Sequence, residues 1–444
     1  MMDSAERRSL AHAVLERSRA ERTEVLVHDD AQALTRFNHD VIHQNVASSI
    51  VRVAVRAIAG DRIGVASTTA LDGASLDAVA TRALELAALT RPDPLRAVLP
   101  QPSAYAKSAN AYATATRDAT PDLRARHTSD ILRTARDAQV WSAGYVTTST
   151  SGITVANSNG VDASFDQSNA GVNVKMNAPD ATGFAEQYVV DASELDAAAV
   201  AAVAAKKAID TRAPRAVDPG DWTVILEPAA LGELLAYLTD HFSAQAYHEG
   251  SSFLSAGFDT VQLDANVTFV DDATHPLRPG MPFDFEGAPT ERVVLVENGA
   301  PRNIVTDAYW ASRLDRKNTG HALPAPNTGG PEVRHLVVAP GTKPVSQLIA
   351  ETQRGLLISR FWYIRNVDQR QTIVTGMTRD GTYLIENGAL AGGVKNMRFN
   401  QNILAALGAC EFSNQLKRTG GYAYGLLAPA AKIERFTFSS GTEF

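Results

Sequence analysis

The sequence predicts an α+β protein with two domains. The N-terminal domain is an α/β domain with a mixed sheet and a β-meander, and the C-terminal domain is β-rich with an antiparallel, barrel-like sheet. Three observations support this. A chain of 444 residues is longer than one hydrophobic core usually organises. Helical periods alternate with extended runs in the first half, whereas extended runs dominate the second. Pro and Gly gather between the halves, as in a linker. We therefore assign residues 1–212 and 221–444 to the domains and 213–220 to the linker.

The N-terminal domain is expected to begin with a helix, followed by extended runs. Ser4–Ala20 has apolar residues on one side and Arg and Glu on the other, which is typical of an amphipathic helix. Asp29-Asp30 should join the first two extended runs, and Gly60-Asp61 should form a hairpin turn. The runs are Glu24–His28, Ala33–Phe37, Val41–Val46, Ile50–Ile58 and Arg62–Ser67.

The rest of this domain alternates helices with a β-meander. Helices are predicted over Leu76–Leu89, Thr128–Val140 and Ser193–Ile209 from apolar residues at three- and four-residue spacing. Four prolines make Arg91–Ser103 an extended crossing. Trp141–Val190 is rich in Ser, Thr, Asn, Gly and Val with a period of two, and it contains the turn dipeptide Asn159-Gly160, so it reads as the β-meander.

Composition excludes several classes of protein. Hydrophobic residues make up 45% and charged residues 20%, as in a globular protein, and the net charge is −7 without a long basic cluster, which argues against nucleic acid as a partner. No apolar run is long enough to span a membrane and no signal sequence is recognisable, so we expect a cytoplasmic protein with no membrane partner. The single cysteine, Cys410, lies in an apolar setting and is expected to be a buried, inert thiol.

The stretch Asp221–Gly257 is the most informative part of the C-terminal half. Trp222–Leu226 predicts a strand, and Pro228 then starts a helix whose leucines fall at helical spacing up to about Ala246. This helix would carry histidine and acidic side chains to its C-terminal end. The candidates are Asp240, His241, His248 and Glu249.

These residues suggest two kinds of site. His241 and His248 would lie about 10 Å apart along an unbroken helix, so they could share a metal ion only if the helix unwound near Gln245. Alternatively, His248 and Glu249 are candidates for an acid and a base in a hydrolase. The metalloprotease pattern H-E-x-x-H is absent, and both histidines could equally be polar residues that line a groove or cap a helix.

The second domain is predicted to be an antiparallel sheet or barrel with long loops. Asp271–Asp284 and Thr319–Pro331 are rich in Gly, Pro and His, and long loops on a rigid β scaffold often carry binding groups. The extended runs are Val261–Val270, Arg292–Glu297, Val333–Val338, Ser359–Asn366, Thr372–Asp380, Thr382–Glu386 and Ile433–Ser440.

A cationic and aromatic strand, Arg360–Asn366, is the candidate binding surface for an extended peptide. Alternation would put Arg360, Trp362 and Ile364 on one face and Phe361, Tyr363 and Arg365 on the other. The exposed face could bind a peptide by strand addition, although an ordinary barrel strand with aromatic core residues would show the same pattern. The proposed substrate-binding residues are Arg360, Trp362, His321 and Arg379. No phosphate-binding loop and no G-x-S-x-G motif occurs.

Eight short segments, in order and spacing, resemble the TldD/PmbA family, whose PmbA branch is also called TldE. They are Thr35–Phe37, Ile42–Asn45, Asp61–Thr68, Asn157–Gly160, Glu249–Phe253, Thr319–Ala322, Thr375–Gly381 and Ile385–Gly388. The resemblance implies an α/β domain followed by a β-rich domain, zinc-dependent peptide hydrolysis, and a TldD/TldE pair that encloses a peptide channel.

The resemblance also implies where a zinc site would lie. In the TldD branch, a helix at the position of Gly232–Phe242 carries H-E-x-x-x-H and a later Cys completes the site. Here the first His and the Glu fall on Leu235 and Ala236, and the Cys falls near Thr419-Gly420-Gly421, about ten residues after Cys410. The chain therefore resembles the TldE branch, with no zinc of its own and zinc supplied by a TldD-like partner.

Three hypotheses follow for the function. The first is a TldE-like subunit that helps bind and process extended peptides beside a TldD-like partner. The second is an autonomous hydrolase that uses His241, His248 and Glu249. The third is a peptide-binding homo-oligomer without chemistry.

Overall fold

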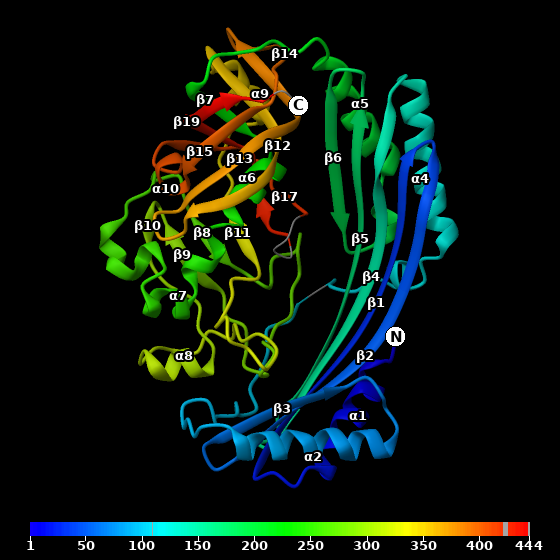
Figure 1. Cartoon of the computed structure of the whole chain (residues 1–444), viewed down its shortest axis with the longest axis vertical. Helices are drawn as coiled ribbons and strands as arrows, with labels where there is room; N and C mark the ends of the chain where they lie inside the picture. Colours follow the sequence, from blue (N-terminus) through cyan, green and yellow to red (C-terminus); the bar gives the residue numbers. More distant parts are fainter. Residues whose placement is uncertain (109, 421–424, 443–444) are drawn as a thin grey trace.

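The computed structural model describes residues 1–108, 110–420 and 425–442, and it confirms the α+β class with a C-terminal barrel. A long curved sheet with helices on its outer face forms the N-terminal half, and the β-rich C-terminal half lies against its inner face (Figure 1). No helix in the described ranges is long and apolar enough to cross a membrane.

The N-terminal sheet has six strands in the order β3-β2-β1-β4-β5-β6. Their bounds are β1 (Arg22–His39), β2 (Val41–Ala59), β3 (Arg62–Thr68), β4 (Trp141–Asn157), β5 (Asp162–Asn177) and β6 (Thr182–Val189). All its neighbouring strands are antiparallel, so the prediction that this sheet is mixed was wrong. Asp29 and Asp30 do not form the predicted turn, because they pair with Val51 and Ile50 inside one continuous ladder.

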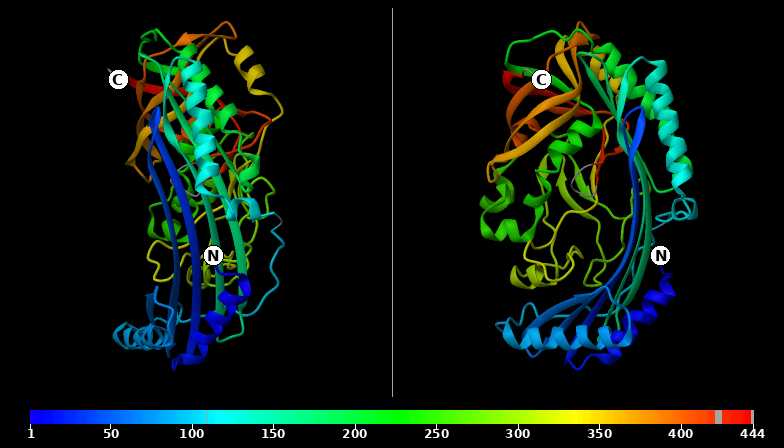
Figure 2. Two further views of the ribbon diagram at one scale, coloured as in Figure 1. Left: turned by 90° about the vertical axis from the view of Figure 1, so that its right-hand side faces the viewer. Right: turned by 45° about the vertical axis from the view of Figure 1, so that its right-hand side comes forward.

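Helices cover only the outer face of this sheet. α1 (Ser4–Arg17) and α2 (Gly73–Leu89) pack on the β1–β3 end, and α4 (Pro121–Asp137) and α5 (Ala197–Asp210) pack on the other end. Residues on β1 alternate accordingly, since Val25 and Val27 are buried beneath the helices whereas the intervening side chains face the C-terminal half. The inner face is left to curve around the C-terminal half (Figure 2).

The C-terminal half contains a closed barrel. Five strands form a ring in the order β12-β7-β19-β15-β13, because β12 also pairs with β13, and β14 extends the sheet from β13. β7 and β12 run parallel, so this barrel is not purely antiparallel as predicted. The strands are β7 (Gly220–Leu226), β12 (Arg354–Asp368), β13 (Ile373–Glu386), β14 (Ala389–Gly393), β15 (Met397–Asn402) and β19 (Ala431–Gly441).

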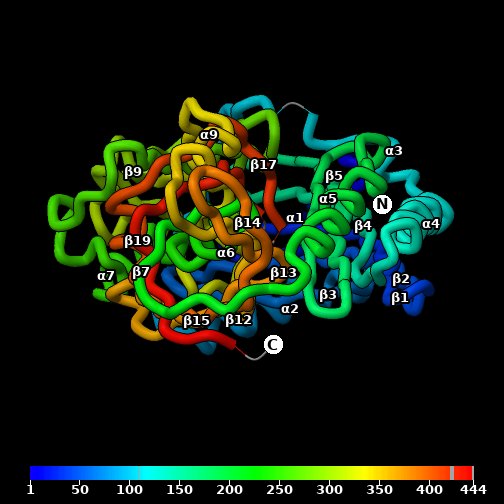
Figure 3. The backbone as a smooth tube through the Cα atoms, turned by 90° about the horizontal axis from the view of Figure 1, so that it is seen from above, coloured from blue at the N-terminus to red at the C-terminus, as the bar shows by residue number. Residues whose placement is uncertain are grey.

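A second sheet of short strands lies below the barrel in the order β10-β9-β8-β11-β18-β17. Its strands are β8 (Phe269–Asp271), β9 (Val293–Glu297), β10 (Ala300–Pro301), β11 (Leu336–Val338), β17 (Lys417–Arg418) and β18 (Leu427–Ala428). The remaining short elements are α3 (Thr114–Arg117), η1 (Ala192–Glu194), η3 (Phe253–Ala256), η4 (Phe258–Thr260), α8 (Ala308–Arg313), α9 (Val345–Ala350), α10 (Ile403–Ala406) and β16 (Cys410–Phe412). Seen from above, β7, β9 and β19 of the C-terminal half lie on one side and β1, β2, β4 and β5 with α4 on the other (Figure 3).

The helix predicted up to about Ala246 is divided into three pieces, α6 (Pro228–Leu235), η2 (Thr239–Phe242) and α7 (Ala244–Glu249). Backbone bonds to a distant segment cause the break. The Val305 N–H donates to the Phe242 carbonyl, and the Ala244 N–H donates to the Val305 carbonyl, which leaves Ser243 extended. Tertiary pairing therefore overrides local helix propensity at this point.

Candidate functional site: a polar cavity between the two halves

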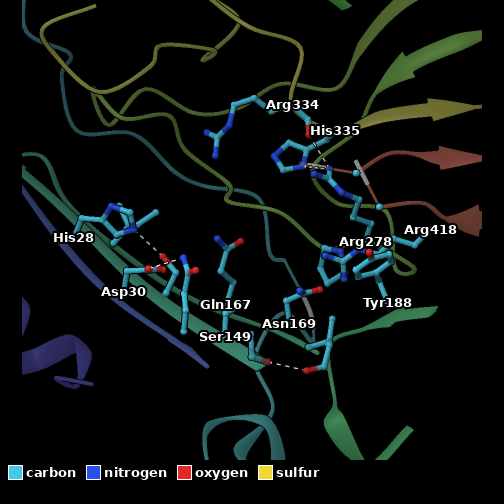
Figure 4. A pocket seen from close by; sticks show the side chains of 18 of the residues that line it. His28, Asp30, Ser149, Gln167, Asn169, Tyr188, Arg278, Arg334, His335 and Arg418 are labelled. Carbon is cyan, nitrogen blue, oxygen red and sulfur yellow. Dashed lines mark hydrogen bonds between the residues drawn. The ribbon is translucent and has the colours of Figure 1, made fainter. Parts of the chain in front are cut away.

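A cavity of about 560 Å³ lies between the inner face of the N-terminal sheet and the C-terminal half. One wall comes from β1, β4, β5 and β6. The other comes from loops of the C-terminal half and from β17, including Arg278, Arg334, His335 and Arg418 (Figure 4). A space of this size is within the range that holds a small organic ligand or a few peptide residues.

The sheet wall is polar because the strand register aligns polar side chains in rows. Gln32, Ser149 and Asn169 are direct neighbours across β1, β4 and β5, and Asp30, Ser151 and Gln167 form the next row. Such rows of hydroxyl and amide groups can exchange hydrogen bonds with the N–H and C=O groups of an extended peptide.

The side-chain oxygen of Asn169 on this wall lacks a hydrogen-bond donor among the described residues. The Asn169 Oδ1 atom is buried and has no hydrogen-bond partner in the part of the chain that the structure describes. A buried acceptor without a donor is destabilising, so a donor from a bound molecule would improve this site.

The opposite wall is cationic. Arg278 Nη1 donates to the Arg334 carbonyl over 2.8 Å and lies 2.7 Å from His335 Nδ1. Burial lowers the pKa of Arg278 to about 9, and the positive charges of Arg418 and Arg334 act in the same direction, against the opposing effect of Asp271. Burial and the adjacent Arg278 also hold the pKa of His335 well below its ordinary value, so this imidazole is neutral and accepts from Arg278.

Asp271 is the carboxylate beside this wall, and polar groups of the chain surround its two oxygens. Oδ2 accepts the N–H groups of Arg334 and His335, each over 2.8 Å, and Oδ1 lies 3.2 Å from His321 Nε2. Burial alone would raise the pKa of Asp271, but His321, His335 and the backbone bond hold it well below its ordinary value. Asp271 is thus a fixed anion that orders the 334–335 segment.

The four predicted substrate-binding residues lie at two separate places in the structure. Arg360, Trp362 and Arg379 lie together, with the Arg360 guanidinium 4.3 Å from the ring centre of Phe184 on β6 and that of Arg379 4.7 Å from the ring centre of Trp362. They do not line the cavity. His321 is separate from them, being buried in its contact with Asp271.

Two half-buried acids connect the Arg360 cluster with the cavity. Glu233 Oε1 accepts from Arg360 over 3.0 Å, and burial raises the pKa of Glu233 to about 7 against the opposing effect of Arg360. Glu186 on β6 accepts the N–H of Gly420, a cavity residue, and burial raises its pKa as well. The cluster therefore packs the barrel against the N-terminal sheet directly beside the cavity.

The predicted alternation along this strand was wrong. Ile364 is buried like Phe361, whereas Trp362 and Tyr363 are exposed. The reason is an irregularity in the ladder with β13 between Trp362 and Arg365, where Tyr363 has a φ of 59°. A bulge of this kind shifts the following side chains to the other face.

The candidate histidines do not form a common site. His241 is buried, its Nδ1 accepts the Phe253 N–H over 3.3 Å, and burial lowers the pKa of His241 to about 4. His248 and Glu249 lie on the exposed side of α7, where His248 packs on the Trp310 ring and Glu249 accepts from Gln245. The helix does break between the two histidines, at the extended Ser243 close to Gln245, but the break leaves His241 buried and His248 exposed on the Trp310 ring, so the two do not share a site.

The positions that the resemblance links to zinc carry unsuitable side chains. Thr419 packs on α6, where a Cβ on Gly232 would lie 2.7 Å from Thr419 Oγ1. Leu235 is buried in the apolar core, and Ala236 has no donor atom in its side chain. Zinc takes Cys, His, Asp or Glu ligands, so these residues do not fit it. Gly421 lies outside the described residues.

Two further observations bear on metal and thiol chemistry. Over the described ranges, no three His, Cys, Asp or Glu side chains are grouped so that they could hold a metal ion. Cys410 is buried as predicted, and burial raises the pKa of its thiol to about 12, which makes it a poor nucleophile.

Sequence reasoning misses Arg278, Arg334 and Arg418. Arg278 lies in the loop Asp271–Asp284, for which binding groups were predicted without naming a residue. Arg334 and Arg418 carry no local signal, because each is one arginine in a short irregular segment or a two-residue strand.

Comparison with known proteins defines the class of this chain. Its three successive parts match domain models of metallopeptidases: the PmbA/TldA metallopeptidase domain 1 over residues 23–87, the central domain over 94–212 and the C-terminal domain over 219–440. The chain belongs to the PmbA/TldD metallopeptidase family.

Individual relatives agree with this assignment. The crystal structure of TldE from Thermococcus kodakarensis superposes with a TM-score of 0.87 at 20% identity, over 98% of this chain and 100% of that one, which shows a common fold. An uncharacterised protein of Methanocaldococcus jannaschii is 30% identical over 40% of this chain and 42% of its own length. A zinc metalloprotease TldD homologue of Saccharolobus solfataricus is 23% identical over 43% of each chain. The chain thus spans about two fifths of the length of these two relatives.

Proposed function

We propose that this chain is a TldE-like subunit that binds extended peptides in the cavity between its two halves, while a TldD-like partner supplies the zinc that hydrolyses them. The observation that carries the proposal is the polar sheet wall. Its rows of Ser, Gln and Asn side chains face a space of about 560 Å³. They include an Asn169 acceptor without a donor in the described part of the chain. A peptide main chain supplies donors and acceptors of matching kind.

The residues at the zinc positions support the division of roles. Leu235 at the end of α6, Ala236 just after it and Thr419 beside this helix offer no imidazole, thiolate or carboxylate. Binding without this chain's own metal is therefore the function that these residues fit. Hydrolysis needs a second chain that carries the ligands.

An unpaired sheet edge is a suitable surface for that partner. β3 pairs with residues 53–59 of β2, so within the described ranges residues 41–52 have a neighbouring strand on one side alone. This edge exposes Val41, Ile42, Val46 and Ile50 and has little charge to protect it. We assign it to the TldD-like subunit, because a second copy of this chain would add no further metal ligands.

Peptide binding by the purified full-length chain tests the proposal. A fluorescent, unstructured peptide should bind at micromolar concentration, and Asn169→Leu should weaken binding about tenfold, because one hydrogen bond to a buried group is lost. Asn177→Leu, at the far end of β5, is the matched control. Equal binding by both variants would place the peptide outside the cavity, and no binding by the unmodified chain would contradict the proposed function.

The partner surface is tested by the composition of the complex. Co-expressed with a TldD-like protein, the chain should elute with it, and Val46→Lys should abolish co-elution because it puts a charge on the apolar edge. Unchanged co-elution of the variant would exclude this edge. A homodimer of the chain alone that Val46→Lys dissociates would favour the homo-oligomeric binding protein instead.

A further inference from the structure

We propose that the end of the cavity formed by Arg418, Arg278 and Arg334 binds a carboxylate of the peptide. This inference rests on the proposed peptide-binding function and adds a chemical requirement to it. The carboxylate has two sources, the C-terminal α-carboxylate of the peptide or the side chain of an Asp or Glu within it.

Arg418 is the residue on which the site depends. It belongs to the two-residue strand β17, whose backbone pairs with Leu427 and Ala428 of β18. Because side chains alternate along a strand, Lys417 lies on the exposed side and Arg418 lines the cavity beside Tyr188 (Figure 4). The Arg418 guanidinium makes no hydrogen bond or ion pair with any residue that the structure describes, apart from the electrostatic influence of the Tyr188 phenol.

The surroundings of Arg418 are unfavourable for a cation in the absence of an anion. Burial lowers the pKa of Arg418, and the Arg418 charge itself lowers the pKa of Arg278. The buried Arg278 and the half-buried Arg418 thus face the same space, with Arg334 nearby. A buried charge is normally matched by one of opposite sign.

The nearby acids of the chain are engaged elsewhere. Asp271 Oδ2 accepts the backbone N–H groups of Arg334 and His335, Oδ1 lies 3.2 Å from His321 Nε2, and the Asp271 charge acts on Arg278. Glu186 lies two residues before Tyr188 on β6. It accepts the Gly420 N–H and interacts with the charge of Arg360. Asp30 lines the sheet wall and accepts from Gln32. An external anion is therefore the natural partner of Arg418.

A carboxylate fits this position better than an unspecified anion because of the wall beside it. The rows of hydroxyl and amide groups on β4 and β5 belong to the same cavity as the arginines. A peptide whose main chain bonds to these rows would bring an acidic group within reach of them. Arginine forms paired hydrogen bonds with planar carboxylates, which adds orientation to charge attraction.

Three peptides of one sequence distinguish the sources. We suggest acetylated Ala-Ser-Ala-Ser-Ala with a free C-terminal carboxylate, the same peptide amidated, and an amidated version with Glu in place of the central Ala. Their affinities for the full-length chain would be measured by calorimetry at low salt. We expect one or both acidic peptides to bind about 10- to 100-fold more tightly than the neutral one, as one charge-assisted contact would give.

Variants of β17 then assign the effect to Arg418. Arg418→Gln should remove the preference for the acidic peptide and leave the amidated neutral peptide unaffected, whereas Arg418→Lys should keep part of the preference. Lys417→Gln loses the same charge from the adjacent exposed position and should bind like the unmodified chain. Arg334→Gln is a second test at the same end, in case Arg418→Gln fails to fold.

The outcomes separate the two proposals. Equal affinity of the unmodified chain for all three peptides, with Asn169→Leu still impaired, would overturn the carboxylate site and leave the peptide cavity intact. An acidic preference that survives both Arg418→Gln and Arg334→Gln would also overturn it. No binding of any of the peptides would overturn the proposed function and this inference together.

Discussion

Two buried arginines at the interface between the halves of the molecule have opposite surroundings. Arg56 on β2 donates to Glu24 over 2.7 Å and to Glu286, from the C-terminal half, over 2.8 Å. Burial alone would lower the pKa of Arg56, but these two carboxylates raise it above its ordinary value. Arg278 is equally buried, yet its pKa is lowered to about 9 and two further arginines share its space.

The comparison distinguishes a structural role for Arg56 from a ligand-binding role for an arginine of the cavity. The Arg56 network joins the N-terminal sheet to the loop at Glu286 and satisfies its own charges, which indicates a structural role. Arg418 in the cavity makes no ion pair with a carboxylate in the described part of the chain, and it is therefore the charge that can serve a ligand. Charge compensation, rather than burial alone, distinguishes the two regions.

The largest expected effect is the loss of stability when the compensated arginine is removed. Arg56→Met leaves Glu24 and Glu286 without their cation at a buried site, which should reduce the free energy of unfolding by about 3–5 kcal/mol. Urea unfolding measures this. The control is Arg52→Met, on the same strand but exposed, with an expected change below about 0.5 kcal/mol. Equal effects of the two variants would show that the Arg56 network does not hold the interface.

The second prediction concerns pH and a buried base that is kept neutral. The folded-state pKa of His241, about 4, is below its ordinary value of 6.5. A lowered histidine pKa means that protonation favours the unfolded chain, so stability is retained above pH 6.5 and is lost as the pH falls towards 4. His241→Phe should reduce the loss of melting temperature in this range. The exposed His248→Phe should leave the pH profile unchanged, and a matching profile for both variants would contradict the buried position of His241.

The third prediction contrasts Arg418 directly with Arg56. Because no carboxylate is left unpaired when Arg418 is removed, Arg418→Gln should change the free energy of unfolding by less than about 1 kcal/mol, towards higher stability if at all. Urea unfolding beside Arg56→Met provides the test. A loss as large as that of Arg56→Met would mean that Arg418 is a structural cation, and the comparison would fail.

The smallest effect is expected at the exposed end of α7. Glu249 and His248 lie outside the cavity, so Glu249→Gln should leave peptide binding, and any hydrolysis by the complex with a TldD-like partner, unchanged within error. Loss of hydrolysis on this substitution would revive the autonomous hydrolase.

Much of the fold could be predicted from local patterns. The helix at Leu76–Leu89, the turn at Asn159-Gly160 and the strand at Trp222–Leu226 follow from periodicity, caps and turn residues, and all lie within or between the observed elements. The direction in which strands pair and the length of each strand could not be predicted from these local patterns. The Asp29-Asp30 pair has turn-forming residues, but a long ladder with β2 holds it extended.

The candidate site was harder to predict because it is assembled from distant segments. Arg360 and Trp362 on β12 lie close to Arg379 on β13 because these two strands pair. Their role in substrate binding remains a prediction, and they lie beside the cavity rather than in it. The cavity itself combines residues such as Asn169 and Arg278 that are about a hundred positions apart and belong to different halves. A local sequence pattern cannot predict that residues so far apart in the chain line one cavity.

The most direct test of the central claim is the zinc content of the purified chain, measured by mass spectrometry alone and after co-expression with a TldD-like partner. Our account predicts no stoichiometric zinc in the lone chain and about one zinc per pair in the complex, because Leu235, Ala236 and Thr419 offer no zinc ligands. Stoichiometric zinc in the lone chain would contradict it.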